Sequence, residues 1–329
     1  RDDARLNDVC FVDPEWGWAA GDRGTIWHTG NGGREWHLQS TGVECPLYSV
    51  YFLDRQNGWA VGGFTHPFTH TGTGVVLMTA DGGRTWQTRQ QPLLPILKKV
   101  RFFDARQGWA IGCRSAASPS GLFRTETGGR SWDPMPSAKQ PGWTSGDFLD
   151  PGNGALAGQD GSAAEVRNGR ISTSQTPRFG LRGPQALQLV PPYFGWLVGE
   201  GGLVMLTRDL GHTWQTPQVP VPFDSAAHFD FCDLSVRNAR VWIVGSPGTK
   251  VFFTPDAGLS WQTFSTRQNA PLRAIHFADD RHGWAVGDFG TILASDDGGQ
   301  TWRRQRAGGT RAALMAVFAD GRDLPLELF

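Results

Sequence analysis

The sequence predicts an all-β chain, a seven-bladed β-propeller whose blades are four-stranded and antiparallel. Two short motifs recur at a fixed separation along the 329 residues, and the whole unit repeats every 41 to 50 residues. Repeats of that length with four short strands each are typical of propeller blades. Glycine contributes 44 residues and proline 21, which supplies turns for an all-β chain, and no long helical period competes.

Each repeat begins with an apolar strand such as "LYSVYFLD" and continues into a second strand built on a Gly-Trp motif such as "GWAVG". A third strand then leads through a polar turn into a fourth. We therefore expect one propeller over residues 1–308, with a tail at 309–329. The second-strand markers are Trp18, Trp59, Trp109, Ala155, Trp196, Trp242 and Trp284. The expected blades are about 6–40, 47–90, 97–136, 146–175, 186–217, 230–265 and 272–306.

The fourth repeat departs from the pattern. It keeps the strand lengths, but Ala155 replaces the tryptophan and the polar turn is reduced to Asn168-Gly169. Asn-Gly is the favoured two-residue hairpin turn. We therefore expect a blade with a tight final hairpin here.

The polar turn looks at first like an active site, because its last copy, "SDDGGQTW", places two acids beside a tryptophan. It recurs six times, however, and a repeated turn has a structural explanation: small polar side chains bond nearby amides, glycine supplies a positive φ, and the tryptophan packs between blades. Asp296 aligns with Gly30, Ala80, Glu126, Arg208 and Pro255, so the second carboxylate is not a regular part of the turn. The expected turn residues are Asn31, Asp81, Thr127, Asp209, Asp256 and Asp297, with Trp36, Trp86, Trp132, Trp214, Trp261 and Trp302.

These copies resemble the Asp-box, or bacterial neuraminidase repeat. The unit "LRAIHFADDRHGWAVGDFGTILASDDGGQTW" is similar to the repeats of the photosystem II stability and assembly factor family, over roughly residues 6–305. The resemblance implies a non-catalytic assembly scaffold with an arginine-rich patch for a membrane-protein precursor. It also implies that the Asp-box is structural. Asn31 and Thr127 depart from the Asp-box pattern.

Composition narrows the function classes. The chain has 31 basic and 31 acidic residues, so its zero net charge argues against a general nucleic-acid or anionic-membrane binder. No apolar run is long enough to span a bilayer. Cys10, Cys45, Cys113 and Cys232 show no metal spacing, and we expect them to be buried small hydrophobic residues rather than disulfides.

The sequence can be compared with two enzyme classes, the sialidases and other glycosidases. A sialidase resemblance would require an arginine triad, an "FRIP"-like segment and a tyrosine nucleophile with a glutamate, and only Tyr193 and Glu200 form a candidate pair. A glycosidase needs two carboxyl groups, and Asp22, Glu200 and Asp288 hold equivalent places after the second strand. A glycoside hydrolase, a carbohydrate-binding propeller or an accessory module of a larger enzyme therefore stays as the alternative. We assign no catalytic residue and expect no cofactor and no metal.

The favoured function is recognition of a protein or peptide, with a membrane-protein segment as one candidate partner. Variable loops on a rigid scaffold carry binding in many proteins, and arginine suits carboxylate capture. His66 and His70 fall in a Pro- and Gly-bearing loop and are expected to contact a partner rather than a metal. The expected binding residues are Arg23, Arg89, Arg114, Arg178, Arg182, Arg267, Trp143, His66 and His70, with Arg304 also between repeats.

The ends of the sequence suggest a longer protein. The chain starts at Arg1 without a methionine, so we expect that a signal peptide, an anchor or a domain precedes it. The tail at 309–329 does not complete an eighth blade and is expected to open a following domain. We expect an extracytoplasmic location, in a periplasm, a lumen or the outside medium, and no nucleic-acid partner.

Overall fold

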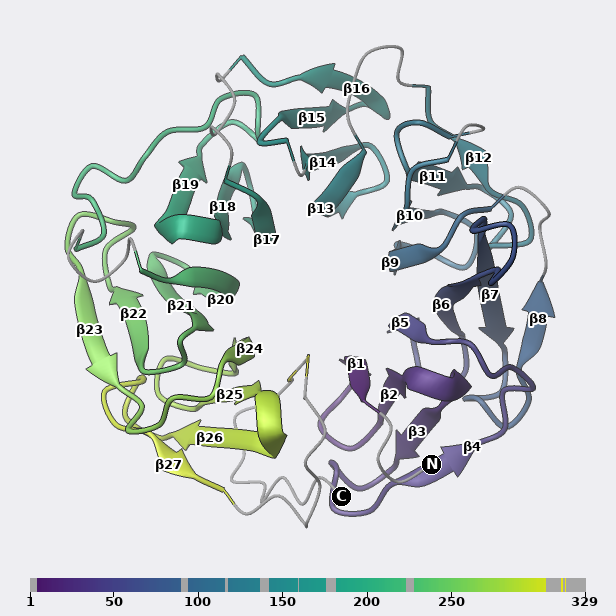
Figure 1. Cartoon of the computed structure of the whole chain (residues 1–329), viewed down its shortest axis with the longest axis horizontal. Helices are drawn as coiled ribbons and strands as arrows, with labels where there is room; N and C mark the ends of the chain where they lie inside the picture. Colours follow the sequence, from purple (N-terminus) through teal and green to yellow (C-terminus); the bar gives the residue numbers. More distant parts are fainter. Residues whose placement is uncertain are drawn as a thin grey trace. The chain divides into compact units, whose positions relative to one another are not determined.

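The computed structural model (Figure 1) is built of β-strands, with three short 3₁₀ turns as its remaining regular structure among the described residues. It describes residues 5–89, 94–115, 118–136, 142–158, 160–175, 182–222, 228–305, 315 and 317, without the side chain of Arg89. Seven antiparallel sheets confirm the predicted all-β, seven-bladed propeller. The chain divides into two compact units, one within Arg1–Gly142 and one within Trp143–Arg306, and each is described by itself.

The first unit holds three blades, each with its strands in sequence order across the sheet. The first blade also contains the 3₁₀ turn η1 (Asp22–Gly24). The strands are β1 (Leu6–Phe11), β2 (Gly17–Gly21), β3 (Ile26–Thr29) and β4 (His37–Gln39); β5 (Leu47–Phe52), β6 (Gly58–Thr65), β7 (Gly72–Thr79) and β8 (Gln87–Arg89); β9 (Leu97–Phe102), β10 (Gly108–Gly112), β11 (Leu122–Thr125) and β12 (Asp133–Pro134).

The second unit holds four blades and the 3₁₀ turns η2 (Glu200–Gly202) and η3 (Asp288–Gly290). The strands are β13 (Trp143–Asp150), β14 (Asn153–Gly158), β15 (Ala163–Arg167) and β16 (Arg170–Thr173); β17 (Pro184–Val190), β18 (Phe194–Gly199) and β19 (Leu203–Thr207); β20 (Asp230–Arg237), β21 (Arg240–Ser246), β22 (Lys250–Thr254) and β23 (Gln262–Ser265); β24 (Leu272–Phe277), β25 (Gly283–Gly287), β26 (Thr291–Ser295) and β27 (Arg303–Arg304).

The fifth blade differs from the expected four strands. Its outer strand is reduced to a single bridge between Leu206 and Gln215. Pro217 and Pro220 follow in the sequence, and proline cannot donate a backbone hydrogen bond to a strand ladder. The fourth blade forms the predicted tight hairpin, since Arg167 pairs with Arg170 around Asn168-Gly169, both at positive φ.

The hydrophobic core lies between adjacent blades. The tryptophan of a second strand stacks on a phenylalanine from the first strand of the next blade, as Trp18 does on Phe52 with ring centroids 3.5 Å apart. The tryptophan of the polar turn then meets that phenylalanine edge-on, as Trp86 meets Phe52 at 5.8 Å. The same stack joins Trp59 to Phe102 and Trp242 to Phe277, at 3.7 and 3.9 Å. The repeated aromatic residues therefore pack adjacent blades against one another.

The glycine of the "GW" motif is required by that phenylalanine. Gly58 is paired with Phe52, and a Cβ atom at Gly58 would overlap the Phe52 ring. In the sixth blade the glycine is replaced by Val241, and its paired residue is Val236 instead of phenylalanine. The smaller partner makes room for the larger residue, so the replacement of the motif's glycine is matched by a change on the neighbouring strand.

The first strands of neighbouring blades are also joined by polar side chains, of which Asp147 is buried and Asp8 and Asp233 are half-buried. Asp8 accepts hydrogen bonds from the amides of Val9 and Val50 at 2.9 and 3.0 Å. Asp147 and Asp233 repeat the contact in the second unit, each accepting from a first-strand amide 42 residues further along. Burial raises the pKa of Asp8, against the effect of its hydrogen bonds to Ser49, Val50 and Val9. These acids were not predicted from the sequence.

All four cysteines are free, as expected. Their burial is only partly as expected, because Cys113 is exposed in the loop after β10 while the other three are half-buried. Burial raises the pKa of the Cys10 thiol to about 12. The tail at 309–329, apart from Met315 and Val317, lies outside the described residues.

Candidate functional site

Two edges of each blade have different chemistry. Because strands alternate in direction, the turns between third and fourth strands lie on one edge, here named the Asp-box edge. The loops between second and third strands and the connections to the next blade lie on the other, the loop edge. The candidate residues divide between these two edges.

On the Asp-box edge, the acid of each turn is engaged by its own turn. Asp297 accepts hydrogen bonds from the backbone amide and hydroxyl of Thr301 at 3.0 and 2.6 Å, and from the hydroxyl of Ser295 at 2.8 Å. Burial opposes ionisation of Asp297, but these hydrogen bonds outweigh it and lower its pKa. Its neighbour Asp296 instead forms an exposed ion pair with Arg303 at 2.6 Å.

The other turns repeat this geometry. Asp81, Asp209 and Asp256 each accept from the residue four positions later, at 2.8 to 2.9 Å. Asn31 and Thr127 use a side-chain oxygen in the same way, accepting from the amides of Glu35 and Ser131. An amide or a hydroxyl thus supplies the same acceptor where the aspartate is missing.

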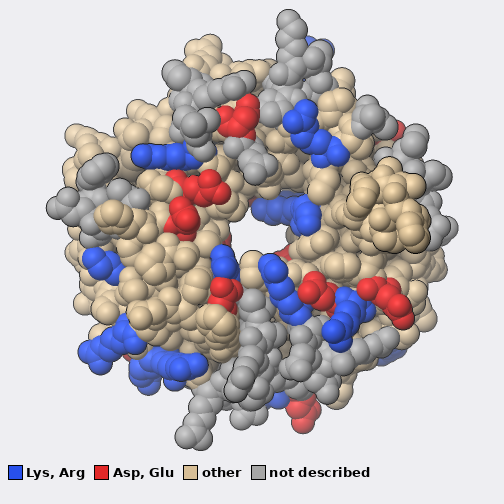
Figure 2. Space-filling model, in the orientation of Figure 1, with Lys and Arg blue, Asp and Glu red and all other residues tan. Residues whose placement is uncertain are grey.

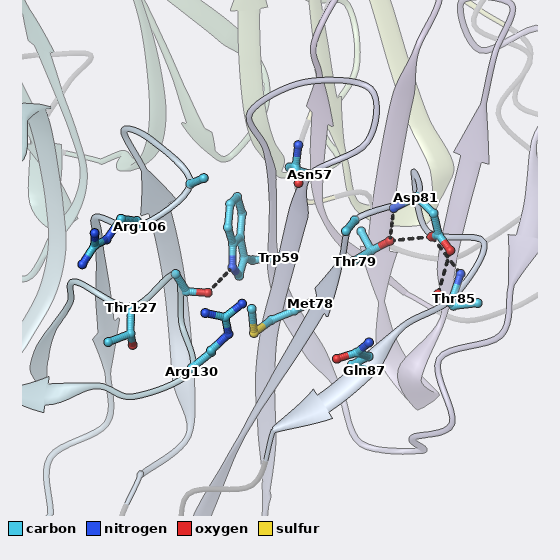
Figure 3. A pocket seen from close by; sticks show the side chains of 13 residues that line it. Asn57, Trp59, Met78, Thr79, Asp81, Thr85, Gln87, Arg106, Thr127 and Arg130 are labelled. Carbon is cyan, nitrogen blue, oxygen red and sulfur yellow. Dashed lines mark hydrogen bonds between the residues drawn. The ribbon is translucent and has the colours of Figure 1, made fainter.

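A cavity of 650 Å³ lies beside two of these turns, between the second and third blades (Figure 3). Trp59 and Met78 supply its apolar wall, while Gln87, Arg106 and Arg130 supply polar groups. The indole nitrogen of Trp59 is engaged, because it donates to the Gly128 carbonyl at 2.9 Å.

Asp81 is the only acid among the described residues that line this cavity. Its two carboxylate oxygens accept hydrogen bonds from Thr79 and Thr85 within the turn. Glycoside hydrolysis needs two carboxyl groups on either side of the scissile bond. The lining of this cavity therefore offers apolar and guanidinium contacts for a bound molecule and does not supply that pair.

The proposed sialidase pair is separated by the structure. Tyr193 precedes β18 and Glu200 follows it, so the two side chains lie at opposite ends of a six-residue strand, about 20 Å in length. A nucleophile and its base must lie within hydrogen-bond reach. Tyr193 and Glu200 do not meet this requirement.

On the loop edge, the three acids of the glycosidase alternative are held by a repeated contact. In the first, fifth and seventh blades, the acid after the second strand binds the second residue of the first strand. Asn7 donates to Asp22 at 3.1 Å and Gln185 to Glu200 at 3.2 Å. Arg273 binds Asp288 through two hydrogen bonds, at 2.9 and 2.7 Å. This pair of positions was missed, although the partners are always 15 residues apart.

The residue at the second position of each first strand is the sequence signal for this contact. In the second and third blades this position is Tyr48 and Lys98, and the ammonium of Lys98 lies 3.3 Å from the centroid of the Tyr48 ring. Lys98 is exposed and Tyr48 half-buried, at the start of strands β9 and β5. They add a basic and an aromatic group to the loop edge of the first unit.

Four of the predicted arginines are exposed on the loop edge, and a fifth, Arg304, lies opposite Leu293 in an outer strand. Arg23 lies in η1 and Arg114 follows β10 in the first unit, while Arg182 and Arg267 lie in connections of the second unit. Arg304 is exposed in β27. Figure 2 shows basic side chains beside acidic ones within each unit. Arg178 and the side chain of Arg89 lie outside the described residues.

Trp143 is a correction. It was expected in a surface connection, but it begins β13 and its exposed fraction is 2%. The sequence "KQPGW" reads as a loop, and the strand that Trp143 opens was expected only from residue 146. A buried indole cannot contribute to a binding surface.

His66 and His70 lie on the loop edge, in the hairpin between β6 and β7. The Nδ1 atom of His66 accepts from the amides of Phe68 and Thr69 at 3.4 Å, so it stabilises the loop. Within the described part of the chain, no three His, Cys, Asp or Glu side chains are grouped as metal ligands. No helix there has the length and apolar character needed to cross a bilayer.

The repeats are similar to those of known proteins. Residues 184–273 and 259–318 match the family described as Photosynthesis system II assembly factor YCF48. The chain is 26% identical over 185 residues to the photosystem II assembly protein Ycf48 of Synechococcus sp. (strain JA-3-3Ab), covering 52% of each chain. It is 26% identical over 114 residues to the chloroplastic photosystem II stability/assembly factor HCF136 of Arabidopsis thaliana, covering 34% of this chain and 28% of that one. The chain thus spans between about a quarter and about half of these relatives.

A solved structure of YCF48 bound to D1 peptide has the same fold. Its TM-score is 0.68 at 20% identity, and the match covers 90% of this chain and 92% of that one. At this identity, the likeness concerns the arrangement of the blades.

Proposed function

We propose a function for this photosystem II assembly factor-like seven-bladed propeller. It acts as a non-catalytic scaffold and binds a peptide segment of a protein partner along its loop edge. Arg23 and Arg114 of the first unit are the principal contacts. Arg182 and Arg267 act in the same role on the second unit.

The observation that carries the proposal is that four exposed arginines of the loop edge have no acidic partner. Other arginines are held by an acid, as Arg55 is by Asp13 at 2.6 Å and Arg273 by Asp288 at 2.7 Å. Arg34 and Arg84 on the Asp-box edge also have no acid within 4 Å among the described residues, so they differ from the four in their edge and serve as the control. Among the residues described, no Asp or Glu oxygen lies within 4 Å of the four loop-edge arginines. A guanidinium without an internal partner is available for a carboxylate on a ligand. These four arginines are Arg23, Arg114, Arg182 and Arg267.

The loop edge of the first unit carries further groups that suit a peptide. Lys98 over Tyr48 adds a cation and an aromatic face to the three blades that also carry Arg23 and Arg114. Asp22, the acid next to Arg23, is bound by Asn7. A segment with carboxylate side chains or a free C-terminal carboxylate fits these groups, and the peptide complex of a YCF48 protein supports a peptide as the class of ligand.

Charge reversal tests the proposal. The Arg23→Glu/Arg114→Glu variant is compared with Arg34→Glu/Arg84→Glu, which makes the same charge change in two exposed Asp-box turns of the first unit. We expect an acidic peptide with a free C-terminus, titrated at low salt, to lose at least about tenfold in affinity only with the loop-edge variant. An equal loss in both variants would show nonspecific attraction, and no loss in either would overturn the proposal.

The extracytoplasmic location belongs to the proposal as well. The chloroplastic location in the name of the Arabidopsis relative supports a compartment outside the cytosol for proteins of this kind. Fractionation of the native cells with an antibody to this chain tests it. Recovery with cytosolic markers alone would contradict this location.

A further inference from the structure

The β6–β7 hairpin of the second blade is longer than its counterparts. Strands β6 and β7 have eight residues each, whereas β2 and β10 have five and β3 and β11 have four. The extra residues pair across the hairpin, from Gly63 with Gly74 to Thr65 with Gly72. At about 3.3 Å per residue, three added pairs extend the hairpin by about 10 Å beyond the loop edge.

The tip of this hairpin is aromatic and contains no Lys, Arg, Asp or Glu. All residues from 64 to 72 are exposed, with Phe68 87% and Phe64 42% exposed. The sequence from residue 56 to residue 80 contains no Lys, Arg, Asp or Glu, although such residues make up 19% of the chain. At the place of this hairpin in Figure 1, Figure 2 shows a protruding knob without basic or acidic side chains.

Four backbone amides of the tip donate to acceptors within the tip itself. The amides of His66 and His70 donate to the carbonyls of Thr71 and His66 at 2.9 Å. The amides of Phe68 and Thr69 donate to the His66 ring at 3.4 Å. Pro67 has no amide hydrogen. A loop in water does not need this arrangement, because water would satisfy its amides.

We propose that the β6–β7 tip, with Phe64 and Phe68, inserts into the interfacial region of a lipid bilayer and holds the loop edge against the membrane surface. Moving a backbone amide or a charge into a bilayer is costly unless it is paired. The tip carries four paired amides and no Lys, Arg, Asp or Glu. Aromatic side chains favour the interface between lipid and water.

The composition and hydrogen bonds of the tip favour lipid over a protein groove as its environment. A protein groove offers acceptors to the amides of a loop that docks in it. Here the amides of His66, Phe68, Thr69 and His70 already donate within the tip, and its exposed apolar groups are the Phe64 and Phe68 rings. The insertion does not depend on the arginines of the loop edge, so it stands apart from the proposed function.

Flotation with vesicles tests the inference. The probe is phosphatidylcholine vesicles without anionic lipid, mixed with the folded chain at increasing lipid concentration. We expect the wild-type chain to float with the vesicles, and Phe68→Ala to lower its partition coefficient by about tenfold or more, the scale of one exposed phenylalanine. Phe68→Trp should retain binding, since tryptophan also favours the interface.

Phe289→Ala is the matched control, because Phe289 is 70% exposed in η3 and has charged neighbours. It should float as the wild type does. Absence of flotation by the wild type, or equal flotation of the Phe68→Ala chain, would overturn the inference. Flotation that requires anionic lipid and disappears in Arg23→Glu/Arg114→Glu would also overturn it. Unchanged unfolding curves for Phe68→Ala and Phe68→Trp confirm that each chain compared is folded.

Discussion

The indole nitrogen of Trp18 donates a hydrogen bond to the carbonyl of Gly82 at 3.0 Å, across 64 residues of sequence. Trp18 lies in the second strand of the first blade, and Gly82 in the Asp-box turn of the second. Trp59 bonds Gly128 and Trp242 bonds Gly298 in the same way, at 2.9 and 2.8 Å. The two repeated motifs therefore act together, because the tryptophan of one blade holds the Asp-box turn of the next by a hydrogen bond.

Replacing Trp59 by Phe should destabilise the chain by about 1–3 kcal/mol, because it leaves the Gly128 carbonyl without its buried donor. The measurement is the free energy of unfolding in urea. Trp284→Phe is the control, since the Trp284 nitrogen has no hydrogen-bond partner among the residues described. Equal losses in the two variants would mean that the hydrogen bond contributes nothing beyond ring size.

The pairing of motif glycine with phenylalanine predicts a coupled effect in the sixth blade. Val236→Phe should cost about 1–3 kcal/mol, because the added ring meets Val241. Adding Val241→Gly should restore most of that loss by recreating the Gly–Phe pair found in five other blades. A double-mutant cycle of unfolding free energies measures the coupling. Additive effects would contradict the size compensation.

Asp297→Ala should cost about 0.5–2 kcal/mol, the scale of a lost side-chain cap, because Thr301 loses its acceptor. Asp296→Ala, next to it, should cost at most about 0.5 kcal/mol, because its ion pair with Arg303 is exposed. Both should leave peptide binding unchanged in the folded protein. A binding defect in Asp297→Ala with an unchanged melting temperature would show a functional role for the turn.

Acidification should weaken the fold through Asp279. Burial opposes its ionisation, but hydrogen bonds from His282 and the Arg281 amide outweigh this and lower its pKa to about 2. Because the pKa of Asp279 is lower in the folded chain than in the unfolded chain, its carboxylate stabilises the fold above about pH 4. This contribution to the free energy of unfolding is lost as the pH falls toward 2. Asp279→Asn should flatten this part of the stability profile, and Asp280→Asn should not. An unchanged slope in Asp279→Asn would assign the loss to other acids.

Much of the fold could be predicted because the same local chemistry is repeated. The Asp-box turn is read from residues within eight positions of one another, and six copies make its role plain. The exchange of glycine for Val241 was visible, but its cause was not. That cause is Val236, and recognising it requires the strand register that sets the two residues opposite one another.

The loop edge was predicted less completely, because its contacts also depend on how strands and blades pack. Arginines in loops can be found by inspection, whereas Lys98 over Tyr48 joins two blades and depends on their packing. Trp143 was misplaced because a proline and a glycine before it suggested a loop. The pairing of Asp22 with Asn7 was missed because each residue is ordinary alone, and only the repeated separation of 15 residues marks it.

Hydrogen exchange of the chain, with and without a bound acidic peptide, tests most directly whether the loop edge is the binding surface. We predict slower exchange on binding in η1 and in the segment after β10, around Arg23 and Arg114, with the Asp-box turns of the same blades unchanged. Protection confined to the Asp-box turns, for example at residues 80–86 beside the cavity, would contradict the proposed function.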